Sequence, residues 1–208
     1  MCPHVLIPYK PVNPKTRLAN LLNQNERETF ARAMLEDVIA AVRDAICTPV
    51  VVATELFESD EVQITLADMD LSGTINSLLP TAVAPLLIIM ADLPLADAES
   101  IKRVYATQKD MAFVPGRGGG TNVIFMRDPA KFHVDYYGSS YLKHIKIAED
   151  AQLSWEMIDS FRLHTDIDEK DDLVELLIHG KGKSRAYLEG LGFRINVEAG
   201  RVGITRAS

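Results

Sequence analysis

Residues 86–95 read Leu-Leu-Ile-Ile-Met-Ala-Asp-Leu-Pro-Leu and mark the centre of the predicted sheet. The opening apolar run has no polar alternation, which is typical of a central parallel strand covered on both faces. Asp92 stands where that strand ends. Because ligands of an open parallel sheet bind outside the carboxyl ends of the strands, Asp92 is a candidate functional residue. Its alternative role is to cap a turn.

Strands and helices alternate on either side of this run. Short apolar or alternating segments predict strands at residues 5–7, 49–53, 62–66, 111–114 and 122–126, and residues 160–163 are also strand-like. Helical spacing of apolar residues predicts helices at 26–42, 99–107, 141–151, 171–179 and 184–191. The alternation predicts an α/β fold in a single domain, residues 1–208, with three α/β/α layers around a mostly parallel central sheet.

Composition excludes several classes of protein. Hydrophobic residues make up 47% and charged residues 25% of the 208 residues, which is ordinary globular usage and excludes wholesale disorder or a fibrous repeat. The net charge of -7 argues against broad nucleic-acid binding. We see no stretch long enough to span a bilayer and no signal peptide. Two cysteines far apart in sequence, Cys2 and Cys47, fit a reducing compartment, so we expect a cytoplasmic protein.

Three cations occupy a proline-braced loop after the first predicted strand. Lys10, Lys15 and Arg17 lie among prolines 8, 11 and 14. Held in such a loop, they would bind a triphosphate and stabilise a leaving pyrophosphate. The alternative is a solvated surface loop.

Carboxylates follow two of the predicted strands. Asp166 and Asp168 flank one residue, and an extended segment would point both side chains to the same side. Together with Asp92 they form an oxygen-only set, which suits magnesium and, beside cations, nucleotidyl transfer. The alternative is that Asp166 or Asp168 caps the helix that follows.

Two glycine-containing segments could contact a ligand. In residues 116–122, consecutive glycines would let backbone approach a ligand, with Thr121 and Asn122 as polar contacts; the alternative is a hairpin turn. Gly138, Ser139 and Ser140 precede a predicted helix, where N–H groups and hydroxyls suit a phosphate or carboxylate. The alternative there is an ordinary serine cap.

Other motifs carry no function. Residues 182–184 resemble the end of a phosphate-binding P-loop, but the upstream glycine position is Leu177 and no strand leads into it. No dinucleotide-binding glycine motif is present. His133 and His144 have no sequence-near acid partner, and we interpret both as structural histidines.

The order of these motifs resembles a known family. The matching segments are residues 7–10, 14–18, 73–76, 92–95, 119–122, 137–140 with His144, and 166–168. In this order they resemble the 2-phospho-L-lactate guanylyltransferase family of coenzyme F-420 biosynthesis. That family belongs to the nucleotidyltransferases with a glycosyltransferase-A-like fold. The resemblance implies a Rossmann-like fold of the nucleotide-diphospho-sugar-transferase type.

The resemblance also implies a reaction. GMP would pass from GTP to 2-phospho-L-lactate, or to phosphoenolpyruvate as in related bacterial enzymes, with release of pyrophosphate. A phosphate acceptor is already an oxyanion, so no acid–base residue is needed. The alternatives are a sister nucleotidyltransferase acting on a sugar phosphate or molybdopterin, and a non-catalytic nucleotide-binding protein.

Residue roles follow from the family pattern. The implied Mg²⁺ ligands are Asp92, Asp166 and Asp168. Thr121, Gly138 and either Ser139 or Ser140 would hold the acceptor. The implied nucleotide-binding residues are Lys10, Lys15, Arg17, Asn76 and Asp92, of which Lys15, Arg17 and Asp92 are also the candidate catalytic residues.

This sequence departs from the family pattern at three places. Gly116 stands where the family usually has aspartate, Ile75 replaces a leucine, and the Gly138 motif is one residue shorter. Residues 193–208 form a predicted C-terminal extension, whose apolar positions 193, 195, 197, 202 and 204 have no evident intrachain role. We expect them to form the contact of a homodimer.

Overall fold

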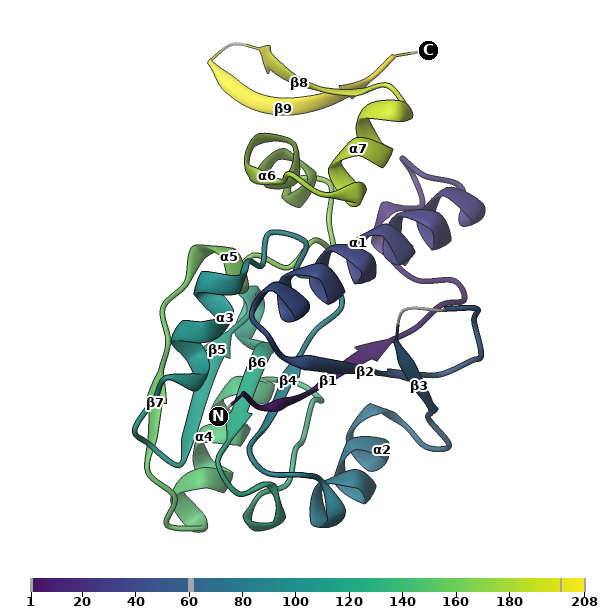
Figure 1. Ribbon diagram of the computed structural model, residues 1–208. Coiled ribbons are helices and arrows are strands. Elements are labelled where there is room, and N and C mark those ends of the chain that lie inside the picture. The colour runs from purple at the N-terminus through teal and green to yellow at the C-terminus, as the bar shows by residue number, and fades with distance from the viewer. Residues whose placement is uncertain (1, 60–61, 199, 208) are drawn as a thin grey trace.

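The computed structural model describes residues 2–59, 62–198 and 200–207, and centres on a seven-stranded sheet (Figure 1). The strand order is β3-β2-β1-β4-β6-β5-β7. The strands are β1 (His4–Tyr9), β2 (Thr48–Ala53), β3 (Gln63–Leu66), β4 (Leu86–Ile89), β5 (Met111–Pro115), β6 (Thr121–Met126) and β7 (Trp155–Met157).

The sheet is mostly parallel, as predicted, with one reversed strand. Strand β1 pairs in parallel with β2 and β4, β2 with β3, and β5 with β7. Strand β6 is antiparallel to both of its neighbours, β4 and β5. Since β6 runs backwards, its first residues lie at the edge where the other strands end.

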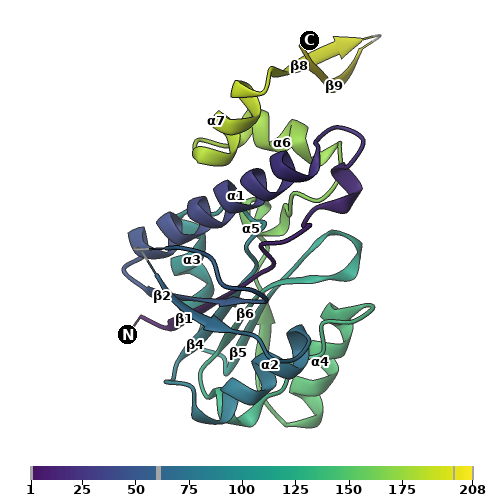
Figure 2. The same cartoon turned by 90° about the vertical axis from the view of Figure 1, so that its right-hand side faces the viewer.

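Helices cover both faces of the sheet. Helices α1 and α3 lie on one face and α2 and α4 on the other (Figure 2). The α-helices are α1 (Gln24–Asp44), α2 (Leu71–Leu78), α3 (Ala98–Tyr105), α4 (Ser140–Asp150), α5 (Phe161–His164), α6 (Asp172–His179) and α7 (Lys183–Gly190). Short 3-10 turns are η1 (Thr16–Leu18), η2 (Leu79–Thr81), η3 (Arg117–Gly119) and η4 (Pro129–Lys131).

Strand β4 contributes to a hydrophobic cluster on each face. Leu87 and Ile89 pack in the cluster under α1, while Leu86 and Ile88 pack in the cluster on the opposite face. All four side chains are at most 1% exposed. The prediction of a central strand covered on both faces is confirmed.

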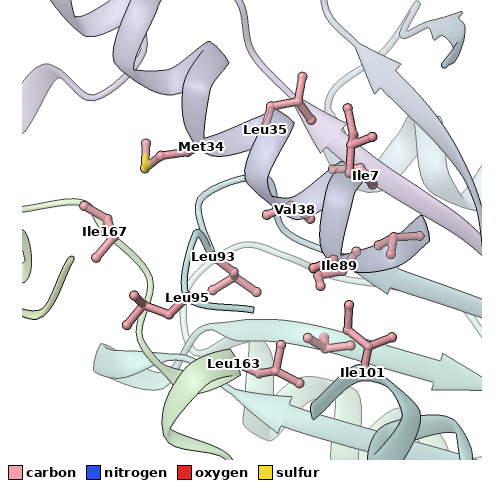
Figure 3. Packing of buried hydrophobic residues seen from close by; sticks show 14 of the residues in the cluster. Ile7, Met34, Leu35, Val38, Ile89, Leu93, Leu95, Ile101, Leu163 and Ile167 are labelled. Carbon is pink, nitrogen blue, oxygen red and sulfur yellow. The ribbon is translucent and has the colours of Figure 1, made fainter. Parts of the chain in front are cut away.

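Helix α1 begins at a capping box, in which Asn23 and Glu26 satisfy one another's backbone N–H groups. Its buried residues Met34 and Val38 lie in the cluster with Ile89 and with Leu93, which directly follows Asp92 (Figure 3). The same packing therefore holds the helix on the sheet and anchors the segment after β4.

The C-terminal part stands apart from the large sheet. Helix α7 packs against α1, and strands β8 (Phe193–Glu198) and β9 (Arg201–Arg206) form a separate antiparallel hairpin beyond it (Figures 1 and 2). Phe193 is fully buried and Ile204 is 9% exposed, and both belong to the main cluster. The expectation that these two positions lack an intrachain role is therefore wrong.

Two local predictions need correction. Residues 161–164 form helix α5, because Ser160 caps the turn and Thr165 bonds back to the carbonyl of Phe161; the neighbouring strand is β7. Helix α2 is absent from the prediction, although Asp70 caps it in the usual way.

Within the residues described, no helix is both long and apolar enough to cross a membrane.

Candidate active site

Cations and carboxylates from distant parts of the chain meet at the carboxyl edge of the sheet. The Lys15 Nζ lies 2.7 Å from Asp92 Oδ2 and 3.3 Å from Asp168 Oδ1. Arg17 pairs with the other oxygen of Asp168. The Lys15 side chain is only 9% exposed, against 31% for Asp92 and 30% for Asp168, so the ammonium lies beneath carboxylates that remain open to solvent.

The charge of Lys15 depends on these two partners. Burial alone lowers the pKa of Lys15, but the carboxylates of Asp92 and Asp168 outweigh it and raise that pKa. The amine is therefore held as a cation between the two carboxylates.

Buried apolar neighbours orient the two carboxylate segments. The N–H of Ile167 donates to the carbonyl of Asp92 across 3.0 Å. Ile167 and Leu93 are both fully buried in the cluster that Figure 3 draws. Because these side chains point into the core, the aspartates beside them are left at the surface of the site.

A second ion pair braces the loop that carries Asp168. The backbone N–H groups of Asp168 and Glu169 both donate to Asp172 Oδ2, at 2.9 and 2.7 Å. Arg117, in the glycine-rich turn, pairs with Asp172 Oδ1 at 2.9 Å. The two loops are therefore tied together through Asp172, a buried residue.

The structure places Asp166 against an amide rather than against Lys15. Asn122 Nδ2 donates to the carbonyls of Leu163 and His164, at 2.9 and 3.2 Å, and lies 3.3 Å from Asp166 Oδ1. Asn122, predicted as a polar ligand contact, thus fastens the segment that leads to Asp166. Gly116 permits this arrangement, since a Cβ there would lie 2.2 Å from Asn122 Oδ1.

The carboxylates fit a divalent cation in their chemistry. Within the described parts of the chain, no group of three His, Cys, Asp or Glu residues is arranged to hold a metal ion. Nevertheless, Asp92 and Asp168 share one cation, the Lys15 ammonium, and offer oxygen donors only. The point between them therefore suits positive charge, and hard oxygen donors are what Mg²⁺ prefers.

The loop that carries Lys15 is strained and held by a buried arginine. Asn13 and Lys15 have φ values of 46° and 50°, in the left-handed region that non-glycine residues rarely adopt. Arg27 donates to the carbonyls of Pro14 and Leu22, both at 3.1 Å, and to Asn13 Oδ1 at 2.7 Å. Such strain persists only where the surroundings over-determine it, and Arg27 supplies that constraint.

The glycine-rich segment is a hairpin turn that also approaches the serine motif. It joins β5 to β6, with Gly118 and Gly119 at φ values of 73° and 86°. A Cβ on Gly119 would lie 3.9 Å from Ser139 Oγ, so the turn passes beside the start of α4. The alternative prediction, a hairpin turn, is therefore confirmed. A ligand-binding role for this segment stays a prediction.

Thr121 and Ser140 meet at this point, together with His144. Thr121 Oγ1 lies 3.2 Å from Ser140 Oγ and 2.9 Å from His144 Nδ1. All three residues are at most 4% exposed. Ser139, by contrast, is exposed and is the N-cap residue without a side-chain cap bond, and Gly138 has a φ of 66°.

Two adjoining cavities open at the same edge and share Pro8, Tyr9, Lys10 and Met90. The first, the Lys15 cavity, has about 220 Å³ and is also lined by Lys15, Asp92 and Asp168. The second, the Met69 cavity, has about 310 Å³ and is mainly apolar, with Val52, Ala67, Met69, Leu71, Thr54, Asp70 and Thr74. Lys10 is exposed and borders both cavities.

Asn76 lines neither of these two cavities. Its Nδ2 donates to the carbonyl of Val134 at 2.9 Å, and the N–H of Val134 donates to its Oδ1 at 2.8 Å. Both ends of the amide are therefore engaged in joining α2 to the segment before α4. A nucleoside contact by Asn76 stays a prediction, and these two hydrogen bonds would have to be exchanged for it.

The P-loop-like segment at 182–184 has an internal partner. The carboxylate of Asp37 accepts from the N–H groups of Lys183 and Ser184, at 2.6 and 3.0 Å. The N-terminus of α7 is thus capped by an acid of the same chain, and its dismissal as a phosphate site agrees with the structure.

The sequence analysis does not identify three residues that support the site, namely Arg27, Arg117 and Asp172. Arg27 falls on the buried stripe of α1, where a charged residue among apolar positions signals an internal partner. Arg117 and Asp172 are ordinary surface types in sequence, and no local pattern indicates their pairing.

Comparison with known proteins supports one family. Residues 3–207 match the family described as Guanylyl transferase CofC like. The chain is 68% identical over 206 residues to the 2-phospho-L-lactate guanylyltransferase of Methanoregula boonei, covering 99% of this chain and 96% of that protein. It is 56% identical over 205 residues to the protein of that name from Methanoculleus marisnigri, covering 98% and 95%.

Solved structures support the fold. A candidate nucleotide-diphospho-sugar transferase from Desulfovibrio desulfuricans G20 superposes with a TM-score of 0.76 at 16% identity, covering 91% of this chain and 95% of that one. A cytidylyltransferase from Leptospira borgpetersenii superposes with a TM-score of 0.55 at 14% identity, covering 91% and 92%. With a family match across nearly its whole length and close relatives of one name, the chain belongs to the family of CofC-like guanylyl transferases.

Proposed function

We propose that this protein transfers GMP from GTP to 2-phospho-L-lactate and releases pyrophosphate. The observation that carries the proposal is the convergence of Lys15, Arg17, Asp92 and Asp168 at the edge of the sheet, in a chain 68% identical to a 2-phospho-L-lactate guanylyltransferase. A phosphate oxygen of the acceptor attacks the α-phosphorus, an O–P bond forms, and the bond to the β-phosphate oxygen breaks. The electron pair leaves with pyrophosphate, and no proton need move.

The chain's own residues supply positive charge along the triphosphate. Lys10 and Lys15 border the Lys15 cavity, and Arg17 reaches the same edge through its pair with Asp168. Arginine and lysine neutralise charge that develops on the leaving pyrophosphate, and this is the main need of phosphoryl transfer. The Met69 cavity adjoins and is apolar, so we assign the guanine base to it.

We assign magnesium to the carboxylates of Asp92 and Asp168, with Asp166 as the third predicted ligand. When bound, the ion would neutralise phosphate charge and orient the triphosphate. Asp92 and Asp168 already share a cation, which supports the assignment. With both carboxylates bound to such an ion, the Lys15 ammonium would be available to pair with phosphate.

We assign the acceptor to Thr121, Gly138, Ser139 and Ser140. The start of β6 and the start of α4 lie together, and they supply hydroxyls and backbone N–H groups for a carboxylate or phosphate. The buried Ser140 touches Thr121, whereas Ser139 faces the glycine-rich turn, so Ser140 is our choice as the acceptor's hydroxyl ligand.

We further propose a cytoplasmic homodimer that binds small molecules only. Cys2 and Cys47 are free thiols, as a reducing compartment would keep them. Exposed apolar side chains on the hairpin, Ile195, Val197 and Val202, support the hairpin as the dimer contact.

The deciding experiment incubates the protein with each nucleoside triphosphate and a set of phosphorylated three-carbon acids. We expect pyrophosphate release and a lactyl-diphospho-guanosine product, by mass spectrometry, from GTP with 2-phospholactate and Mg²⁺. Excess EDTA should abolish turnover and added Mg²⁺ restore it. A preference for another nucleotide or a sugar phosphate would favour a sister nucleotidyltransferase, and GTP binding without product would favour a non-catalytic protein.

A further inference from the structure

His144 is a buried histidine that the proposed reaction does not use, yet it touches a residue assigned to the acceptor. It lies one turn after Ser140 on α4 and is fully buried. Its ring stacks on Phe113, with centroids 6.4 Å apart, and meets Tyr136 edge-on at 5.0 Å. The ring is therefore fixed in place, and both of its nitrogens have partners.

The hydrogen bonds determine which nitrogen carries the proton. The backbone N–H of Asp135 lies 2.9 Å from His144 Nε2, and a backbone N–H can only donate. Nε2 must therefore accept. In the neutral ring the proton then sits on Nδ1, which lies 2.9 Å from Thr121 Oγ1 and donates to it.

The number of hydrogens on these three groups determines whether the hydroxyl pair can donate to a ligand. His144 Nδ1, Thr121 Oγ1 and Ser140 Oγ carry one hydrogen each, and two contacts join them. Two hydrogens fill those contacts, and one hydroxyl hydrogen remains for a further acceptor. With the opposite tautomer, Nδ1 would accept, both hydroxyl hydrogens would be used internally, and the pair would have no hydrogen to donate.

We propose that His144 is a positioning residue for the acceptor substrate. By donating to Thr121, it leaves the Thr121–Ser140 hydroxyl pair with one hydrogen for the carboxylate or phosphate of that substrate. The inference rests on the proposed function, because that function places an anion at these hydroxyls. His144 itself does not touch the reacting atoms.

The first test measures the tautomer in the ligand-free full chain. Long-range ¹H–¹⁵N correlation spectra of the ¹⁵N-labelled protein should place the proton of His144 on Nδ1, with its signals assigned by their loss in His144→Phe. A proton on Nε2 would overturn the proposal. This measurement does not depend on catalysis.

The second test separates the two substrates in steady-state kinetics. Thr121→Val and His144→Phe should each raise KM for 2-phospholactate about tenfold or more, since a hydrogen bond to an anion is lost, with KM for GTP within twofold of wild type. Thr121→Ser and His144→Asn keep a hydroxyl and an N–H donor, and they should recover most of the loss. His133→Asn changes an exposed histidine in the connection before α4; it is the matched control and should change neither KM.

The outcomes distinguish a positioning role from a structural one. A purely structural role for His144 would lower kcat through a smaller active fraction and leave the acceptor KM unchanged, or it would change both KM values equally. Either result would overturn the proposal. So would a normal acceptor KM in His144→Phe beside a raised one in Thr121→Val. If wild type releases no pyrophosphate with any acceptor, the proposed function fails, and the tautomer measurement still decides the hydrogen-bond order.

Discussion

At Asp92 the main chain and the side chain have different tasks. The carbonyl accepts from Ile167 and so ties the end of β4 to the segment carrying Asp168, while the carboxylate faces Lys15. A conservative substitution can therefore remove the charge and leave the backbone link in place.

We predict that Asp92→Asn lowers kcat/KM about 100-fold or more, because the site loses a carboxylate that faces the shared cation. The fold should persist, since the backbone bond to Ile167 does not involve the side chain. Pyrophosphate release measures the effect, and circular dichroism checks the fold. Asp150→Asn, at an exposed surface pair with Lys146, is the control and should keep full activity. Near-normal activity of Asp92→Asn would remove this residue from the mechanism.

His144 also predicts a dependence of stability on pH. Burial lowers its pKa from 6.5 to about 4; nearby Asp135 works in the opposite direction, and the charges of His133 and Lys143 add to the lowering. Below pH 6.5 this histidine binds a proton in the unfolded chain but stays neutral in the folded chain. Stability from this group is thus complete above pH 6.5 and is lost as the pH falls toward 4.

Between pH 7 and pH 5 this effect amounts to about 2 kcal/mol of unfolding free energy. Urea unfolding at the two pH values, at constant ionic strength, measures it. In His144→Phe the loss on acidification should shrink by about that amount, whatever the stability of the variant at pH 7. Equal losses in both proteins would contradict the prediction.

At the scale of elements, the loop between β1 and α1 is shaped by the helix that follows it. Arg27, on the first turn of α1, binds carbonyl and amide oxygens of the loop, and Glu28 accepts the N–H of Asn13 at 3.0 Å. The left-handed backbone at Asn13 and Lys15 is therefore maintained from the helix side.

We expect Arg27→Met to raise KM for GTP about tenfold, because Lys15 would no longer be held against Asp92 and Asp168. The variant should also lose about 2 kcal/mol of stability through the buried hydrogen bonds. Initial rates at varied GTP and thermal unfolding measure the two effects. Arg43→Met, exposed at the far end of the same helix, should leave KM for GTP unchanged. Unaltered GTP kinetics in Arg27→Met would show that the loop keeps its conformation without Arg27.

At the scale of the whole molecule, the hairpin β8–β9 combines a core role with an exposed apolar surface. Phe193 and Ile204 belong to the main cluster, while the paired residues Val197 and Val202 are 64% and 54% exposed. The buried end fastens the hairpin, and the exposed end is free to meet a second copy.

Sedimentation of wild type should give twice the chain mass, and the double variant Val197→Glu with Val202→Glu should sediment as a monomer, because charge would enter an apolar contact. The buried residues stay intact, so the fold should survive. Ile46→Glu replaces a still more exposed apolar residue outside the hairpin and should leave the dimer unchanged. A monomeric wild type, or a dimer that tolerates both glutamates, would exclude this contact.

Most of the fold was predictable from local pattern. The run at 86–90 marked the central strand, and the apolar spacing of 26–42 marked the long helix, because burial imposes a period that neighbouring residues report directly. The strand assigned at 160–163 failed because the turn at 161–164 is set by the Ser160 cap, which carries more weight in so short a segment than apolar character.

The amino-acid sequence was enough to predict the alternation of strands and helices, the candidate carboxylates and cations, and the likeness to a guanylyltransferase family. How these groups meet became evident from the folded chain. Strand β6 is reversed, so Thr121 lies at the ligand edge; Lys15 joins Asp92 to Asp168, and Asn122 turns to Asp166. Periodicity records which face of an element is buried, whereas strand direction and side-chain pairing depend on contacts between residues far apart in the chain, such as Lys15 and Asp168, which are 153 positions apart.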